Sequence, residues 1–203
     1  MPDPPFLDLL RAGTADDVGE RILDAALERF STAGVRRASV EDVARACGIN
    51  RVTVYRRFAS KQALLQAVVA REAQRFFAAV DAATRELPEP ADRFVEGVAI
   101  GFGLAREHPL TARLLADEPE TILPVLTQDA EPVIAAGRTL LAALLRDAGT
   151  RAPDPDIAAE ILLRLAISLL LTPHGAIPAT DPEELRAFAR THLLPIAGLG
   201  PGG

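Results

Sequence analysis

The chain has 203 residues, a formal net charge of −6 at pH 7, 49 % hydrophobic residues and 25 % charged residues, which is ordinary for a soluble globular protein. No apolar run approaches the roughly 18–20 residues that a membrane span needs. The N-terminal residues lack the basic start and apolar centre of a signal peptide, and the single cysteine, Cys47, cannot form an intrachain disulfide. We therefore expect a cytoplasmic protein with no membrane partner.

The charge is unevenly distributed along the chain. The segment 36–61 holds two acidic residues and seven basic ones, so it carries +5 while the rest of the chain carries −11. A local basic patch on an acidic body is typical of a site for a polyanion, but a solvated surface that is rich in arginine gives the same count. The seven basic residues are Arg36, Arg37, Arg45, Arg51, Arg56, Arg57 and Lys61.

The first half of the chain predicts an arm and four helices. Residues 1–15 contain three prolines and no clear period, which indicates a flexible N-terminal arm. An apolar stripe predicts a helix from Asp16 to Gly34. Ser39 followed by Asp42 resembles a capping box, and Gly48 ends the helix that it opens. Asn50 is expected to cap a third, short helix. Residues 60–87 are expected to form a long fourth helix.

The second half is punctuated by proline and glycine and predicts further helices only. They are expected near residues 91–108, 110–116, 132–148, 156–171 and 182–194, with an unassigned stretch near 121–130. No segment alternates with a period of two between hairpin turns, and no repeat is visible. The sequence therefore predicts an all-α chain of about nine helices.

The segment CGINRVTVYRRF, residues 47–58, combines poor helix formers with three arginines. A short helix, a glycine turn and a second short helix that carries basic residues form the helix-turn-helix pattern, whose second helix enters the major groove of DNA. Arginine can bind guanine with two hydrogen bonds, and the methyl groups of threonine or valine can pack on thymine. This role explains why the segment tolerates unfavourable helix propensity.

Residues 20–69 closely resemble the DNA-binding domain of the TetR (tetracycline-repressor) family. The matching motifs are ILDAALERF, ASVEDVA, CGINRVTVYRRF and SKQALL, and the resemblance as a whole covers about 60 of the 203 residues. The resemblance implies a helix-turn-helix domain over 16–76, with the motif itself at about 39–58. It also implies a helical domain over 77–203 that binds a ligand and forms a dimer. Asn50 stands where serine is common in the family, and Val52 where a small residue is common.

The resemblance also implies roles for individual side chains. Arg51, Val52, Thr53 and Arg57 are expected to read bases, with Arg56 between base and backbone contacts. Phosphate contacts are expected from Ser39, Tyr55 and Lys61, although Tyr55 could instead be a packing residue with its hydroxyl in water. Arg36 and Arg37 could touch flanking phosphate or lie in a solvated loop.

The second half offers residues for an apolar pocket and for a dimer interface. The same side chains could build an ordinary core, so this alternative stays open for both sets. The pocket candidates are Phe94, Val98, Phe102, Leu114, Leu115, Leu126, Leu140 and Leu144. The interface candidates, on two helices that are apolar on more than one face, are Ile157, Ile161, Leu165, Leu169, Leu185, Phe188 and Leu193.

The function expected from these features is transcriptional repression by a homodimer that a small, apolar inducer releases from a palindromic operator in double-stranded DNA. A helical interaction protein with a degenerate motif, an activator, and a regulator without an inducer are the alternatives. No spacing of histidine and cysteine predicts a metal site, and no grouping of nucleophile and base predicts an enzyme. No cofactor is expected.

Overall fold

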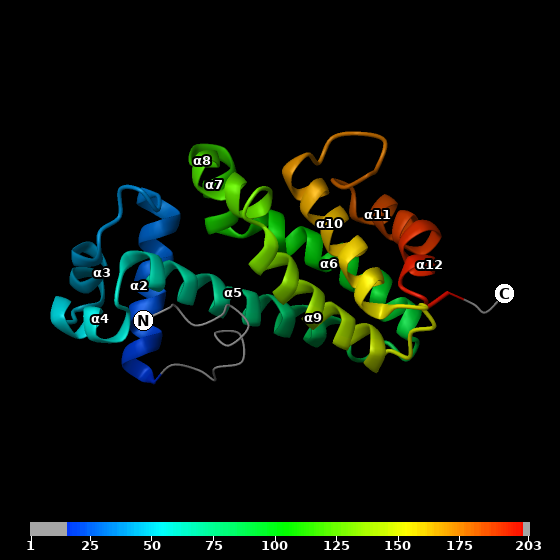
Figure 1. Ribbon diagram of the computed structural model, residues 1–203, viewed down its shortest axis with the longest axis horizontal. Helices are drawn as coiled ribbons and strands as arrows, with labels where there is room; N and C mark the ends of the chain where they lie inside the picture. Colours follow the sequence, from blue (N-terminus) through cyan, green and yellow to red (C-terminus); the bar gives the residue numbers. More distant parts are fainter. Residues whose placement is uncertain (1–15, 201–203) are drawn as a thin grey trace. The chain divides into compact units, whose positions relative to one another are not determined.

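The computed structural model describes residues 16–200, and within that range every regular element is helical, which confirms the all-α class. Figure 1 shows the order of the helices along the chain. Their bounds are α2 Asp17–Ala33, α3 Val40–Cys47, α4 Arg51–Arg57, α5 Lys61–Thr84, α6 Pro90–Glu107, α7 Pro109–Asp117, α8 Pro119–Leu126, α9 Glu131–Asp147, α10 Pro155–Leu171, α11 Pro182–Phe188, the π-helical turn η1 Ala189–Leu193 and α12 Leu194–Ile196. The predicted arm, residues 1–15, lies outside the described residues.

Two elements differ from the sequence-based expectation. The stretch near 121–130, which was left unassigned, contains α8, which begins at Pro119 and holds Pro124 inside it. The last predicted helix is interrupted, because α11 ends at Phe188 and the chain continues through the π-helical turn η1 into α12. A π-helical turn leaves no local sequence signal of the kind that caps and periodicity provide.

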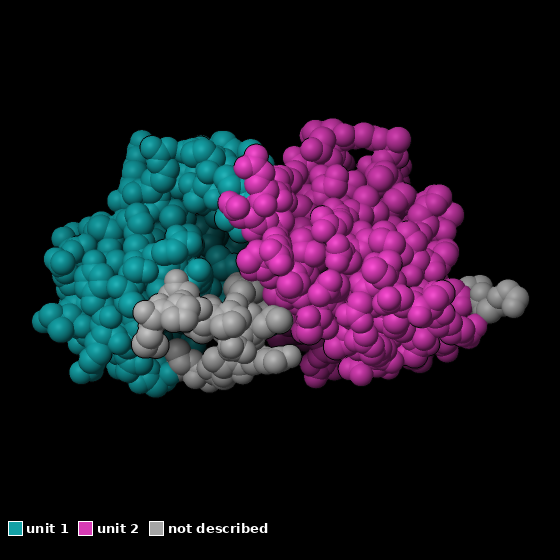
Figure 2. Space-filling view, viewed as in Figure 1, with its two compact units in different colours: residues 1–75, 108–125 teal, residues 76–107, 126–203 magenta. Residues whose placement is uncertain are grey.

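The described chain packs into two compact units (Figure 2). Unit 1 comprises residues 16–75 and 108–125, and unit 2 comprises residues 76–107 and 126–200. The sequence-based division placed everything after residue 76 in the second domain. The structure differs because Leu110 and Leu114 of α7 are buried in the same core as Ile22 and Phe30 of α2. Segment 108–125 therefore packs with the first helices.

Unit 1 is held by a core of aliphatic side chains and Phe30. Val40 and Val43 of α3, Val54 of α4 and Leu64 of α5 all face this core, and Val43, Val54 and Leu64 are fully buried. Burial of one aliphatic side chain stabilises the folded state by about 1.5–3 kcal/mol, so this core fixes α3, α4 and α5 against one another.

Unit 2 is built around α9 and α10, which pack along each other, and α6, which contacts α11. Gly137 of α9 allows a close approach, because a Cβ atom there would lie 2.6 Å from Cδ2 of Leu163 on α10. Gly101 of α6 does the same towards Phe76, at 3.2 Å, so its role is close packing. No helix within residues 16–200 has the length and apolar character that crossing a bilayer requires.

Candidate nucleic-acid interface

The turn between α3 and α4 is fixed by local hydrogen bonds that the sequence predicted. The Ser39 hydroxyl accepts from the Asp42 amide at 3.1 Å, and the Asp42 carboxylate accepts from the Ser39 amide at 3.2 Å, so the capping box is present. Gly48 ends α3 in the left-handed conformation, with φ 66°. The Asn50 side chain then caps α4 by accepting from the Val52 amide at 2.8 Å. These caps set the direction in which α4 leaves the turn.

Helix α4 presents one face to the core and another to solvent. Val54 is fully buried, and Phe58, just past the helix, packs against the same core. Val52 lies on the opposite side with 73 % of its surface exposed, and the side chain of Arg56 is also exposed. Ala or Leu would suit such an exposed helix better than valine does, and the base-reading role of Val52 stays a prediction.

Arg51, at the first position of α4, is held by two neighbours. Its Nη1 atom lies 2.7 Å from Oε1 of Glu41 on α3. Its guanidinium carbon lies 5.3 Å from the centroid of the Tyr55 ring, within the range of a cation–π contact. The side chains of Arg51 and Glu41 are 60 % and 40 % exposed, so the pair is open to a ligand from solvent.

Arg57, at the last position of α4, is engaged differently. Its Nη1 and Nη2 atoms each donate to one carboxylate oxygen of Asp16 at 2.6 Å. Asp16 also caps α2 by accepting from the Gly19 amide. The hydrogen bonds from Arg57 and then from Gly19 hold the pKa of the Asp16 carboxyl below its usual value. The base-reading role of Arg57 stays a prediction.

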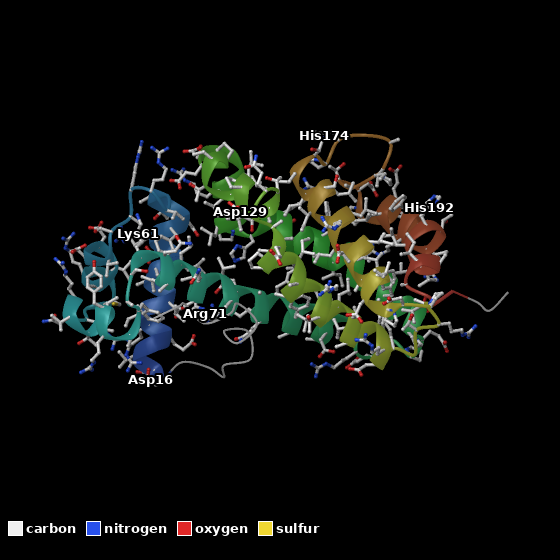
Figure 3. All side chains as sticks on the ribbon, in the orientation of Figure 1. Asp16, Lys61, Arg71, Asp129, His174 and His192 are labelled. Carbon is white, nitrogen blue, oxygen red and sulfur yellow. The ribbon has the colours of Figure 1, made fainter. Side chains whose placement is uncertain are left out.

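Lys61 anchors the loop that precedes α3 (Figure 3). Its ammonium group donates to the backbone carbonyl oxygens of Val35, Arg36 and Ala38 at 2.8, 3.2 and 3.1 Å. An ammonium group has three N–H donors, and all three are used here. The phosphate contact of Lys61 stays a prediction, and the structure adds a structural role that sequence spacing could not reveal.

The other side of the same loop is held by the corner between α7 and α8. The Arg36 amide donates to Oε2 of the buried Glu118 at 3.2 Å, and the Arg36 side chain pairs with Glu120. The sequence left open whether Arg36 and Arg37 touch phosphate or lie in a solvated loop. In the structure, Arg36 has acidic partners. Arg37 is exposed and has none among residues 16–200.

Sequence reasoning missed a buried ionic cluster between α2 and α5. The Arg71 side chain is 7 % exposed, and its Nη1 atom lies 2.8 Å from Asp24 and 3.3 Å from Glu20. Nε2 of His108, just before α7, lies 3.2 Å from Glu72. These contacts link residues far apart in sequence, so no spacing pattern announces them. The cluster fastens α2 to the long helix that follows the motif.

The candidate pocket residues are not brought together by the structure. Leu114 lies in the core of unit 1, Phe94 and Val98 pack against the core of unit 2, and Leu144 is 49 % exposed. A cavity of about 270 Å³ lies elsewhere in unit 2, and Leu126 is the one predicted residue that lines it. Its lining consists of Leu126, Thr127, Ala130, Ile134, Arg164, Ile167, Ser168 and Leu171.

The candidate interface residues separate into two groups. Ile157 and Ile161 on α10 are 56 % and 47 % exposed, and Leu165 is half-buried. Leu169, Leu185 and Leu193 are buried within the single chain, and Phe188 packs against the core of unit 2. The last three helical segments therefore serve the core of their own subunit, because their apolar faces are already covered.

A short helix, a glycine turn and a second short helix with exposed arginines define a helix-turn-helix DNA-binding protein. Comparison with known proteins leads to the same class. Residues 22–68 match the family model described as bacterial regulatory proteins, tetR family, and residues 91–190 match that of the bacterial tetracyclin repressor, C-terminal domain. The chain belongs to the TetR family of transcriptional regulators, whose members are not enzymes.

Individual relatives cover nearly the whole chain. The HTH-type transcriptional regulator UidR of Escherichia coli strain K12 is 41 % identical over 197 residues, which cover 88 % of this chain and 91 % of UidR. The crystal structure of the TetR family repressor AlkX from Dietzia sp. strain DQ12-45-1b, implicated in biodegradation of n-alkanes, has a TM-score of 0.67 at 23 % identity and covers 91 % of this chain and 100 % of its own. A structure on the control of antibiotic production by bacterial hormones has a TM-score of 0.62 at 27 % identity, with 90 % and 98 % covered.

Proposed function

We propose that this regulator is a homodimeric repressor that a small, largely apolar ligand releases from a palindromic operator. The observation that carries the proposal is the exposed face of α4, where Arg51, Val52 and Arg56 are open to solvent while Val54 anchors the helix in the core. Such a helix can enter a major groove without unfolding its own unit. Arg51, Val52 and Thr53 read bases in this proposal, and Arg56 reaches a base or the backbone.

Dimerisation is supported by exposed apolar side chains on two helices that pack along each other. Leu144 of α9 and Ile157 and Ile161 of α10 are each about half exposed. Large apolar side chains gathered on one face of a soluble protein favour association. A two-fold dimer would hold two copies of α4 for two half-sites about 34–36 Å apart, which makes the operator a palindrome.

A ligand is supported by the hollow beside α9 and α10. The cavity of about 270 Å³ has five aliphatic side chains in its lining, and Arg164 and Ser168 supply polar groups. That volume is near the lower end for small-molecule sites. The relative at 27 % identity concerns control by bacterial hormones, which is consistent with a small effector. A ligand can change DNA affinity only by as much as it prefers one state of the protein to the other.

An activator, or a regulator without a ligand, would keep the DNA contacts and differ only in the response. A helical interaction protein with a degenerate motif would not select a DNA sequence. In vitro selection from a random duplex pool separates these classes, since the proposal expects an enriched palindrome. A transcription assay on that site then separates repression from activation.

The ligand part is tested by release from the selected duplex with a panel of small apolar compounds. Ile167→Trp fills the cavity from a half-buried position and should abolish the response to an active compound while leaving DNA binding intact. Leu104→Trp is the control, because Leu104 is exposed on α6 in the same unit and does not line the cavity. A response that survives Ile167→Trp would place the ligand elsewhere.

A further inference from the structure

Arg51 is the arginine of α4 that is both oriented and still able to donate. Glu41 occupies its Nη1 atom at 2.7 Å, and the Tyr55 ring lies under the guanidinium. An arginine has five N–H donors, so the donors on Nε and Nη2 remain for another acceptor. Planar recognition of guanine needs two parallel donors held in a fixed direction.

The other two arginines of α4 lack this combination. Both Nη atoms of Arg57 donate to Asp16, so the pair of donors at the end of its guanidinium is already used. Arg56 is exposed and has no acidic partner among residues 16–200, so it is available but not held. The difference lies in which acidic residue the fold places beside each arginine.

Glu41 also places a negative charge on the surface that is proposed to face DNA. Its carboxylate lies on α3, beside the first turn of α4, and is 40 % exposed. A carboxylate paired with Arg51 lowers the net positive charge offered to phosphate, because the arginine is already neutralised. The same carboxylate leaves the directional donors of Arg51 intact.

We propose that Glu41 is a specificity-determining positioning residue, which holds the Arg51 guanidinium for a base edge and keeps it from serving as a general phosphate contact. The inference rests on the proposed role of α4 in reading bases. Glu41 acts through Arg51 in this scheme and does not itself touch a base. The pair therefore lowers the affinity for DNA of any sequence and raises the preference for one sequence.

The test compares the duplex that the wild-type protein selects from a random pool with a scrambled duplex of the same composition. Glu41→Gln should raise affinity for the scrambled duplex about threefold to tenfold while binding to the selected duplex changes less than about twofold, so the specificity ratio falls. Glu28→Gln on α2 is a control for charge, since Glu28 is exposed and has no ion partner among residues 16–200. Glu120→Gln is a control for the loss of an ion pair away from α4, because it removes the acidic partner of the Arg36 side chain. Both controls should leave the ratio unchanged.

A double-mutant cycle decides whether Glu41 acts through Arg51. In an Arg51→Ala background, Glu41→Gln should leave the specificity ratio unchanged. A ratio that falls equally in that background would overturn the inference, because Glu41 would then contact a base itself. If Glu41→Gln alone left the specificity ratio unchanged, the inference about Glu41 would also be overturned. The proposed function would still stand in that case, provided that the wild-type protein prefers the selected duplex to the scrambled one. A wild-type protein that bound both duplexes equally would overturn both.

Discussion

Single side chains around the helix-turn-helix motif fall into two groups. Some hold the loops and helices in place, and others are exposed and available to a ligand. Lys61 belongs to the first group, because its three donors satisfy three carbonyl oxygens of the loop over residues 35–38. That loop leads into the Ser39 cap of α3. Removing the ammonium group leaves three backbone acceptors to find water, so the consequence is structural before it is electrostatic.

Lys61→Met should lower the free energy of unfolding by about 1.5–3 kcal/mol, since it removes charged hydrogen bonds and keeps the aliphatic stem. Chemical denaturation followed by circular dichroism measures the change. Arg37→Met is the control, because it removes one charge from the same loop at an exposed position. The control should leave stability within about 0.5 kcal/mol. Equal stability for both variants would show that the loop does not depend on Lys61.

The pair of Asp16 and Arg57 predicts a pH dependence at acid pH. The pKa of Asp16 is lowered in the folded protein, first by the hydrogen bonds from Arg57. A carboxyl group whose folded pKa is depressed contributes stability above its unfolded pKa, near 4, and loses it as pH falls through the folded value. Asp16→Asn should therefore be less stable than the wild type at pH 7, and the difference should shrink below about pH 4. Thermal melts across that range test this. A difference that stays constant down to pH 2 would exclude the carboxylate as its source.

Among the elements, the loop between α2 and α3 is closely packed at Gly34. Gly34 has φ 87°, and a Cβ atom at this position would overlap Oε1 of the buried Glu118. Gly48 between α3 and α4 has φ 66°, and nothing lies within 4 Å of the corresponding position. The two glycines therefore share the need for a positive φ and differ in the space around them.

Gly48→Ala should cost about 1–2 kcal/mol of stability through the left-handed backbone alone. Gly34→Ala should cost about 1–3 kcal/mol more than that, because Glu118 must also move away from the Arg36 amide. Urea denaturation of both variants gives the comparison. If Gly48→Ala were the more damaging change, contact with Glu118 would not be what restricts the loop.

The elements also show how far local sequence signals reach. The capping box of Ser39 and Asp42 and the Asn50 cap were predicted, because each depends on residues within one turn of a helix. Pairing of Arg57 with Asp16 and packing of Leu114 against α2 were not predicted, because they join residues far apart in sequence. The candidate pocket residues were also chosen by position along the chain, and of them only Leu126 lines the cavity in unit 2, so their ligand role stays a prediction.

Helix α10 carries the two exposed isoleucines on which the proposed dimer depends. Ile157→Glu combined with Ile161→Glu should convert a dimer into a monomer near 22 kDa, because two exposed apolar positions would become charged. Sedimentation equilibrium at micromolar concentration measures the state. Ala187→Glu on the exposed side of α11 is the control and should leave the dimer intact. A dimer that survives the α10 changes but not Ala187→Glu would move the interface to the last helical segment.

At the scale of the whole molecule, the net charge of −6 conceals a basic segment whose charges are mostly engaged. Arg36, Arg45, Arg51 and Arg57 each have an acidic partner, and Lys61 is bound to carbonyl oxygens. Arg37 and Arg56 have none among residues 16–200. Counting basic residues in the sequence therefore overstates how many cations are free to meet phosphate.

This charge arrangement predicts a modest salt dependence of DNA binding. With two free arginines in each subunit, a dimer should neutralise about four phosphates, and the logarithm of the binding constant should fall with the logarithm of salt with a slope near −3.6. If all seven basic residues of each subunit released counterions, the slope would approach about −13. Arg37→Ala and Arg56→Ala should each reduce the slope by about 1.8 for the dimer, whereas Arg45→Ala should change it by less, because Asp42 already neutralises Arg45. Titrations of one duplex between 50 and 200 mM salt, a range over which such slopes are resolved, give these values. A wild-type slope near −13 would mean that DNA displaces the acidic partners, and Asp16, Glu41, Asp42 and Glu120 would then release their arginines on binding.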